Sequence, residues 1–222
     1  MESFASIFER ACERKGGVAE LEALLPEPLP ARALAETADA AMLAEMTKCV
    51  FRAGFVWQII ENKWSGFEAA FHEFDVSRCA MLSDEELELL CSDDRIVKNA
   101  AKIRSVRGNA GFVAEVRDSH GSFGRYLADW PGDDIVGLWL ELKKRGERLG
   151  GQTGRFFLRF IGKDTPVLSA DVVSALVQQK VVDKEPTSKK ALLELQAAFN
   201  AWAEESGRPL CQISRVLACS VP

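Results

Sequence analysis

Basic residues surround one glycine-rich turn, and an aspartate stands at the head of a later helix. Between residues 142 and 163 there are seven Lys or Arg and one acid, and the turn reads Leu149-Gly150-Gly151-Gln152-Thr153. A glycine turn that opens a helix presents backbone N–H groups and the positive end of the helix dipole, which together hold a phosphate. Basic side chains nearby, such as Lys144 and Arg155, add affinity for a nucleic-acid backbone. We therefore expect these residues to contact the phosphates of a nucleic acid.

This turn, the helix after it and Asp171 resemble the helix-hairpin-helix segment and catalytic aspartate of the DNA base-excision glycosylases. Leu149 begins the Leu-x-Gly-x-Gly pattern of that superfamily. Thr153 stands where its second glycine usually stands, a departure shared by the 3-methyladenine DNA glycosylase I branch. An aspartate at the head of a helix is by itself more often explained by the helix dipole. Its spacing from the hairpin favours the functional interpretation.

A second block of similarity lies between residues 53 and 110. The segments AGFVW, FHEFD and IVKNAAKIRSVRGNA are similar to elements of the 3-methyladenine DNA glycosylase I family and follow that family's order. Several motifs in the right order are more specific than any one of them. The resemblance implies an all-α helix-hairpin-helix DNA glycosylase fold with two helical lobes and an interlobe cleft. It implies a monofunctional DNA-3-methyladenine glycosylase of base excision repair, which hydrolyses the N-glycosidic bond of alkylated purines.

The resemblance also implies roles for individual residues. Asp171 would support attack of water on the sugar, and Trp57 matches the tryptophan that stacks the everted base. Phe51 is a second candidate for this aromatic pocket, with core packing as an equal alternative. The family glutamate that contacts the damaged base is replaced here by Cys49, so this chain resembles a divergent branch. Glu45 lies one helical turn earlier on the same face and is a candidate replacement, although most helical glutamates are simply solvated.

Arg155 decides between two reaction types. Glycosylases that also cut the strand place a nucleophilic Lys at this position and form a Schiff base with the sugar. An Arg cannot lose its proton for that step, so the resemblance implies an enzyme that uses water. Arg155 would contact the DNA backbone or the pocket instead.

The chain lacks the two histidines and the C-terminal cysteine pattern that hold the family's structural zinc. Its six cysteines form no CxxC pair, and only two histidines are present, so we expect no zinc and no other cofactor. Whether a monovalent cation sits in the hairpin is left open. Reduced thiols, the lack of a long apolar run and the lack of an apolar core in the first residues predict a cytoplasmic protein without membrane contact. We expect a monomer.

The charge distribution keeps two other functions open. The net charge of −5 argues against a general nucleic-acid binder, although Arg95 to Arg107 carries five bases and no acid. A non-catalytic DNA-binding relative would explain the missing glutamate and zinc ligands. A helical protein-interaction module would fit the acidic composition, and it would show no affinity for duplex DNA, the partner that the first two functions require.

Periodicity of apolar residues predicts helices throughout the chain. We expect helices at 3–15 and 31–44, one long buried helix at 45–64 with Gly54 inside it, and two helices within 66–90. Ser83 and Glu86 predict a capping box for the second of these two. The sequence predicts a loop-rich bridge at residues 119–133 and the first hairpin helix at 135–146.

We expect a central domain at 45–165 and a second lobe from 1–44 plus 166–222. Asp171 and helix 45–61 would lie on facing walls of the cleft.

Overall fold

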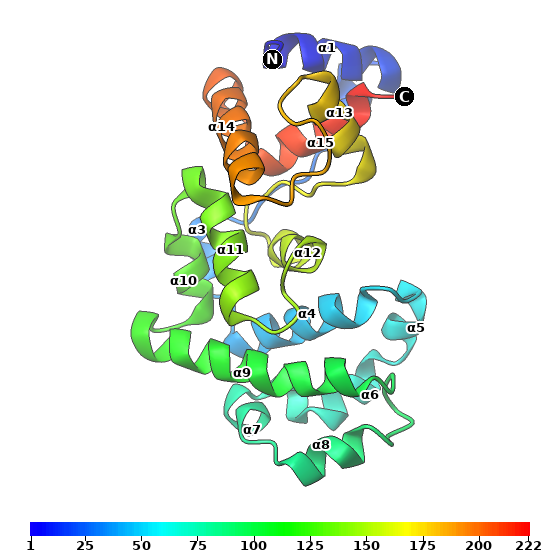
Figure 1. Cartoon of the computed structure of the whole chain (residues 1–222), viewed down its shortest axis with the longest axis vertical. Coiled ribbons are helices and arrows are strands. Elements are labelled where there is room, and N and C mark those ends of the chain that lie inside the picture. The colour runs from blue at the N-terminus through cyan, green and yellow to red at the C-terminus, as the bar shows by residue number, and fades with distance from the viewer. The chain divides into compact units, whose positions relative to one another are not determined.

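The computed structural model describes residues 1–222 and contains helices but no strand (Figure 1), which confirms the all-α prediction. None of these helices is both long and apolar enough to cross a membrane. The principal helices are α1 (Phe4–Lys15), α3 (Ala31–Ala35), α4 (Asp39–Arg52), α5 (Trp57–Asn62), α6 (Trp64–Ala70), α7 (Val76–Ala80), α8 (Asp84–Leu90), α9 (Ala100–His120), α10 (Phe123–Asp129), α11 (Ile135–Arg145), α12 (Gln152–Phe160), α13 (Ala170–Gln178), α14 (Lys189–Ser206) and α15 (Leu210–Ser220).

The residues group into two compact units. Unit 1 contains Met1–Leu29, Pro131–Leu138 and Gly162–Pro222, and unit 2 contains Pro30–Trp130 and Trp139–Ile161. Residues 30–44, which the sequence analysis placed with the termini, group here with the hairpin. The reason is local packing, because Asp39 accepts a hydrogen bond from the Phe123 N–H of α10 at 2.8 Å. The predicted division into lobes at residues 45 and 165 stays a prediction.

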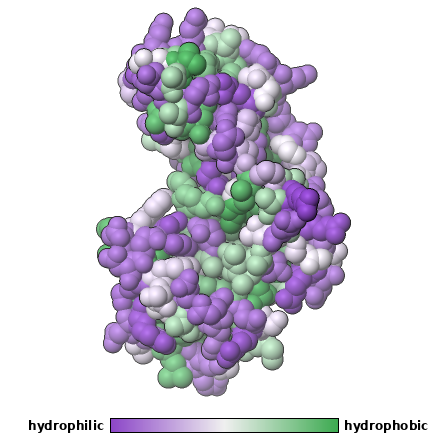
Figure 2. Space-filling model, turned by 180° about the vertical axis from the view of Figure 1, so that it is seen from behind, coloured by the Kyte–Doolittle hydropathy of each residue, from purple (hydrophilic) through white to green (hydrophobic).

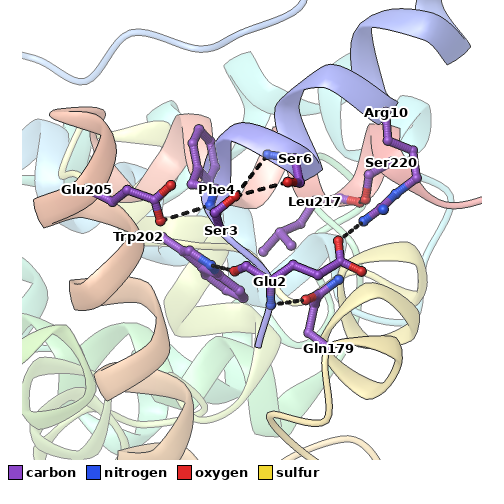
Figure 3. A network of polar contacts seen from close by, with 10 residues as sticks. All are labelled: Glu2, Ser3, Phe4, Ser6, Arg10, Gln179, Trp202, Glu205, Leu217 and Ser220. Carbon is purple, nitrogen blue, oxygen red and sulfur yellow. Dashed lines mark hydrogen bonds and ion pairs between the residues drawn. The ribbon is translucent and has the colours of Figure 1, made fainter.

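Unit 1 joins the two ends of the chain, and a polar network ties the N-terminal residues to its C-terminal helices (Figure 3). Glu205 of α14 accepts a hydrogen bond from the Phe4 N–H at 2.9 Å, at the start of α1. The indole N–H of Trp202 donates to the Glu2 carbonyl at 3.2 Å, and the Glu2 N–H donates to the Gln179 side chain at 2.9 Å. Trp202 itself is fully buried, so the first residues of the chain cover a core position of this unit.

Within unit 2, the predicted long helix at 45–64 is wrong, because α4 ends at Arg52 and α5 begins only at Trp57. The Lys102 ammonium of α9 donates to the carbonyls of Phe51 at 3.2 Å and Ala53 at 2.6 Å, which a continuing helix would have used for its own N–H groups. Gly54 then turns the chain with a φ of +75°. The break is therefore fixed by a side chain distant in sequence.

The segment 66–90, predicted to form two helices, contains more elements than these two. α6 ends at Ala70, a left-handed turn follows, and Asp75 caps the separate helix α7 by accepting from the Arg78 N–H. The predicted capping box of Ser83 and Glu86 at the start of α8 is confirmed. α10 occupies much of the predicted loop at 119–133, with Ser122 as its N-cap. α7, α8 and α10 each begin at a residue whose side chain caps the helix, a signal that apolar periodicity does not contain.

The face drawn in Figure 2 is mostly hydrophilic, with several hydrophobic patches among the polar residues. Exposed large apolar side chains are scattered along most of the chain. The exception is the segment from the α4–α5 loop into α5, where Phe55, Val56, Trp57 and Ile59 are all between 39% and 66% exposed. Such a concentration marks a candidate contact surface.

Candidate functional site

The hairpin connects α11 and α12, and its tight turn requires glycine at two positions. A Cβ on Gly154 would lie 2.2 Å from the Leu149 carbonyl oxygen, so only glycine allows the turn to approach the helix this closely. Gly151 has a φ of +59° directly before α12, a conformation that other residues rarely adopt. The Leu149 side chain is buried and anchors the turn. Leu149, Gly151 and Gly154 of the turn therefore each have a structural cause.

A buried asparagine on α9 fixes the entry to this hairpin. Asn109 is 1% exposed, and its side chain both donates to the Glu147 carbonyl at 3.1 Å and accepts from the Glu147 N–H at 2.8 Å. These two bonds satisfy backbone groups beyond the end of α11. The hairpin is thus positioned by α9, and the sequence analysis missed this residue although it lies inside the quoted motif that ends in Asn109-Ala110.

An aromatic pocket of about 250 Å³ lies beside the hairpin in unit 2. The chain from α4 to α5 contributes Cys49, Arg52, Ala53, Gly54, Phe55 and Trp57 to its lining. Helix α12 contributes Gln152, Thr153, Phe156 and Phe160. The structure therefore brings together four predicted site residues, two from the substrate set and two from the hairpin.

Trp57 forms an aromatic wall of this pocket. It is 44% exposed and makes edge contacts with Phe156 and Phe160, with ring centroids 5.8 and 6.0 Å apart. The two phenylalanines follow each other by one helical turn of α12 and stack at 5.6 Å. The sequence analysis did not assign them, although their spacing places them on one face of the helix that follows the hairpin.

Arg52 brings a positive charge into the same pocket. Its guanidinium lies 5.0 Å from the Trp57 ring centroid and 5.1 Å from that of Phe160. It donates to Glu61 from Nε at 3.1 Å and from Nη2 at 2.5 Å, and to Glu45 from Nη1 at 3.4 Å. Both carboxylates next to the pocket are therefore paired with this arginine. Nothing in the sequence distinguished Arg52 from an ordinary helical arginine.

Glu45 and Cys49 lie on one face of α4, as expected from their spacing. The Cys49 thiol donates to Glu45 Oε1 at 3.5 Å. Burial raises the pKa of Glu45, and the hydrogen bond from Cys49 and the charge of Arg52 oppose this rise. Burial and the neighbouring negative charge of Glu45 raise the pKa of the Cys49 thiol. Cys49 is therefore a neutral thiol in the pocket wall and not an activated nucleophile.

Three other predicted site residues of unit 2 do not line the aromatic pocket. Phe51 is fully buried against Phe67, with ring centroids 4.7 Å apart, and does not line the pocket, which matches the core-packing alternative. The Arg155 guanidinium is buried and lies 4.4 Å from the Trp139 ring centroid, so its contact with DNA stays a prediction. Lys144 is exposed near the end of α11, where a backbone phosphate could reach it.

Asp171 belongs to unit 1 and lies in the first turn of α13. It is exposed, while Ser169 serves as the N-cap of the helix by accepting from the Val172 N–H at 3.3 Å. The helix therefore does not need Asp171 as its cap. Its catalytic role and its place on a wall of the cleft stay predictions.

No group of three or more His, Cys, Asp or Glu side chains is arranged to hold a metal ion, and all six cysteines are free thiols. The absence of a cofactor stays a prediction. The basic residues of 95–107 are largely engaged with neighbouring groups. Lys98 precedes α9 and pairs with Asp94 at 2.5 Å, and Arg107 pairs with Asp84 at 2.8 Å.

Comparison with known proteins identifies the family. A model of the methyladenine glycosylase family matches residues 34–147, just over half of the 222 residues. The chain belongs to the methyladenine glycosylase family. The predicted family is thereby confirmed. The matched segment includes Cys49 and Trp57 of the pocket but ends before the glycine turn and α12, so this part of the site rests on the structure.

The similar proteins and solved structures are named as 3-methyladenine DNA glycosylases. DNA-3-methyladenine glycosylase 1 of Escherichia coli (strain K12) is 34% identical over 59 residues, which are 27% of this chain and 32% of that protein. The match thus spans about a third of that relative's length. A crystal structure of 3-methyladenine DNA glycosylase I aligns with a TM-score of 0.51 and 23% identity over 58% of this chain and 81% of that one.

A second solved structure, of 3-methyladenine DNA glycosylase I from Staphylococcus aureus, aligns with a TM-score of 0.53 and 20% identity. The alignment covers 63% of this chain and 81% of that chain, and the structure is described as the basis of 3-methyladenine recognition. Likenesses at this identity establish the fold. The helical glycosylase fold predicted from the sequence is therefore confirmed.

Proposed function

We propose that this protein is a monofunctional DNA-3-methyladenine glycosylase that releases alkylated purines from duplex DNA by hydrolysis. The observation that carries the proposal is the pocket in which exposed Trp57 and the hairpin residues Gln152 and Thr153 line one cavity. An element suited to holding the DNA backbone thus lies next to an aromatic wall suited to a base. The relatives named as 3-methyladenine glycosylases support this assignment.

In the proposed reaction the hairpin holds the DNA backbone while the damaged nucleotide turns out of the helix. Its base enters the pocket and stacks on Trp57, a contact that contributes about 1–3 kcal/mol per base. Phe55 and Val56 are exposed next to this wall and are apolar side chains of the kind that fill the gap left in the base stack. The exposure of Phe55 and Val56 thereby acquires a role.

Cleavage of the N-glycosidic bond builds positive charge on the sugar, and a nearby carboxylate stabilises that charge and orients the attacking water. Asp171 is the proposed carboxylate, and Glu45 is the second candidate because it is already next to the pocket. A 3-methylated adenine nucleotide is cationic, so its base leaves with little acid catalysis. Arg155 supplies no neutral amine, so no Schiff base forms and the strand stays intact.

The proposed enzyme works as a monomer on double-stranded DNA in the cytoplasm and without a metal or organic cofactor. The water, the carboxylate and the cationic leaving group account for all bonds made and broken. The hairpin of the proposed enzyme is also the place where a monovalent cation would bind next to a DNA phosphate. Comparison of the DNA affinity in buffers with different monovalent cations tests for such a cation.

The deciding experiment is the release of free bases from methylated duplex DNA. Replacement of Trp57 by Ala removes the stacking wall, so we expect base release (kcat/KM) to fall about 5- to 150-fold, in line with 1–3 kcal/mol of stacking. Ile59→Ala is the matched control, because Ile59 is equally exposed on α5 but does not line the pocket. Equal losses for both variants, or no release by the native protein, would contradict the proposed activity.

A non-catalytic DNA-binding relative is the second candidate, and one observation favours it. Cys49 offers no carboxylate to a base, and Arg52 pairs with both carboxylates beside the pocket. Such a protein would bind methylated and unmethylated duplexes alike and release no base. The same assay, combined with a binding measurement, distinguishes the two functions.

A further inference from the structure

A second cavity of about 390 Å³ lies in unit 2 beside the hairpin turn, and we call it the basic niche. None of its lining residues is acidic, and two are cationic. The lining consists of Val50, Ala53, Lys102, Arg148, Gly150 and Thr153. A cavity with two positive charges and no negative one is suited to an anion.

Lys102 is the fixed charge of the niche. The residue is only 5% exposed, and its ammonium group has three N–H donors, two of which bond to the Phe51 and Ala53 carbonyls. The third donor has no hydrogen-bond partner, and the Phe55 ring centroid lies 4.4 Å from the ammonium. Burial lowers the pKa of Lys102, and the positive charge of Arg148 lowers it further. No acidic neighbour offsets these effects, so an anion in the niche would relieve an existing electrostatic cost.

Arg148 is the exposed charge of the niche. It is exposed, forms no ion pair, and adopts a φ of +61°, which is uncommon for a residue other than glycine. A non-glycine residue held in this region is a signal of function when the surroundings impose it. Here the hairpin turn imposes it, and the result is a second cation directed at the cavity that Lys102 lines.

The niche adjoins the aromatic pocket. Ala53 and Thr153 line both cavities, so they form a ridge between an aromatic space and a cationic one. The adjacent helix α12 adds the positive end of its dipole, and its N-cap Gly151 provides no side-chain cap. An aromatic base and a phosphate joined through one sugar are the two parts of a single nucleotide.

We propose that the basic niche binds the phosphate next to the everted nucleotide while the base of that nucleotide occupies the aromatic pocket. The inference rests on the proposed function, since it requires a nucleotide turned out of the duplex. It adds that Lys102 and Arg148 position the substrate by charge, apart from the exposed cations such as Lys144. Free inorganic phosphate has the same chemistry, and the test separates the two sources.

The test combines a protein variant with a neutral phosphate analogue. Arg148→Asn removes the charge and keeps a residue that tolerates a positive φ. Duplexes with an abasic analogue carry one methylphosphonate either beside the lesion or several nucleotides away. We expect Arg148→Asn to weaken binding about tenfold and the adjacent methylphosphonate to weaken it at least as much, because the neutral group also loses Lys102. The combination should be no weaker than the methylphosphonate alone. The slope of log affinity against log salt concentration should decrease in the variant by about the value of one phosphate contact.

The controls make each outcome informative. Arg125→Gln on α10 removes one exposed charge of the same unit outside the niche, and the distant methylphosphonate removes an unrelated contact. Additive losses for Arg148→Asn and the adjacent methylphosphonate would overturn the inference. Arg148-dependent binding of inorganic phosphate together with additive losses on DNA would also overturn it, in favour of a free-anion site. Base release by the native protein is measured in parallel. Non-additive losses without base release would support the phosphate site and contradict the proposed activity. Base release with additive losses would support the activity and contradict the phosphate site.

Discussion

The guanidinium of Arg52 lies over the indole of Trp57, 5.0 Å from the ring centroid, inside the aromatic pocket. Glu61 accepts two hydrogen bonds from it and Glu45 one, so the guanidinium is held in this place and not free in solvent. A base that stacks on Trp57 must therefore lie against this cation or displace it. Arg52 thus controls which charge a ligand of the pocket can carry.

Replacement of Arg52 by Gln should favour cationic bases. The change removes one positive charge next to the ligand and leaves Glu45 without its arginine partner, which makes the local charge more negative by one unit. We expect kcat/KM for release of 3-methyladenine to rise about fivefold, corresponding to roughly 1 kcal/mol for a partly exposed charge pair. An uncharged damaged base is the matched substrate and should gain nothing. An equal change for both substrates would show that the charge of Arg52 is not involved.

Asp171→Asn tests the proposed catalytic carboxylate. Asp171 is exposed and Ser169 caps α13, so the variant should lose at most about 1 kcal/mol of stability from the helix dipole. We expect kcat to fall at least about 100-fold while binding to an abasic duplex is retained. Glu204→Gln, an exposed acid on α14 of the same unit, is the control and should leave kcat unchanged. Unchanged kcat in Asp171→Asn would move the catalytic assignment to Glu45.

The sequence was sufficient for features whose causes are local. The all-α class, the capping box of Ser83 and Glu86, and the hairpin helices at 135–145 and 152–160 follow from apolar period, caps and glycines. The end of α4 at Arg52 could not be predicted in this way. The carbonyls of Phe51 and Ala53 at this end accept hydrogen bonds from Lys102, and this contact depends on how α9 packs against α4. The predicted long helix failed for that reason.

The aromatic pocket shows the same limit. Trp57 and Cys49 were found through the family resemblance, while Arg52, Phe156 and Phe160 were not, because their meaning depends on the break between α4 and α5. Once Gly54 and Ala53 turn the chain, Trp57 faces α12 instead of continuing along α4. The pocket is therefore a consequence of the helix break that sequence periodicity concealed.

Glu45→Gln should change how stability depends on pH. Burial raises the pKa of Glu45 above its ordinary value of 4.5, so the folded protein holds this proton more tightly than the unfolded chain. The contribution of this group to stability is present below pH 4.5 and is lost as the pH rises through the folded-state pKa. The free energy of unfolding of Glu45→Gln, relative to the native protein, should therefore increase from about pH 4 to pH 7. Urea denaturation at both pH values measures it, and a pH-independent difference would contradict the raised pKa.

Two glycine-to-alanine substitutions separate the hairpin from ordinary helix propensity. A Cβ on Gly154 would meet the Leu149 carbonyl oxygen at 2.2 Å, so Gly154→Ala must push the turn away from α12 and should lower the free energy of unfolding by about 1–3 kcal/mol. Gly111 lies within α9 and a Cβ there meets nothing within 4 Å, so Gly111→Ala should raise stability by up to about 1 kcal/mol. Affinity for duplex DNA should fall in Gly154→Ala, because the displaced turn no longer presents its N–H groups, and should be unchanged in Gly111→Ala. Retained affinity in a destabilised Gly154→Ala protein, measured below its unfolding temperature, would show that the hairpin geometry does not hold the DNA.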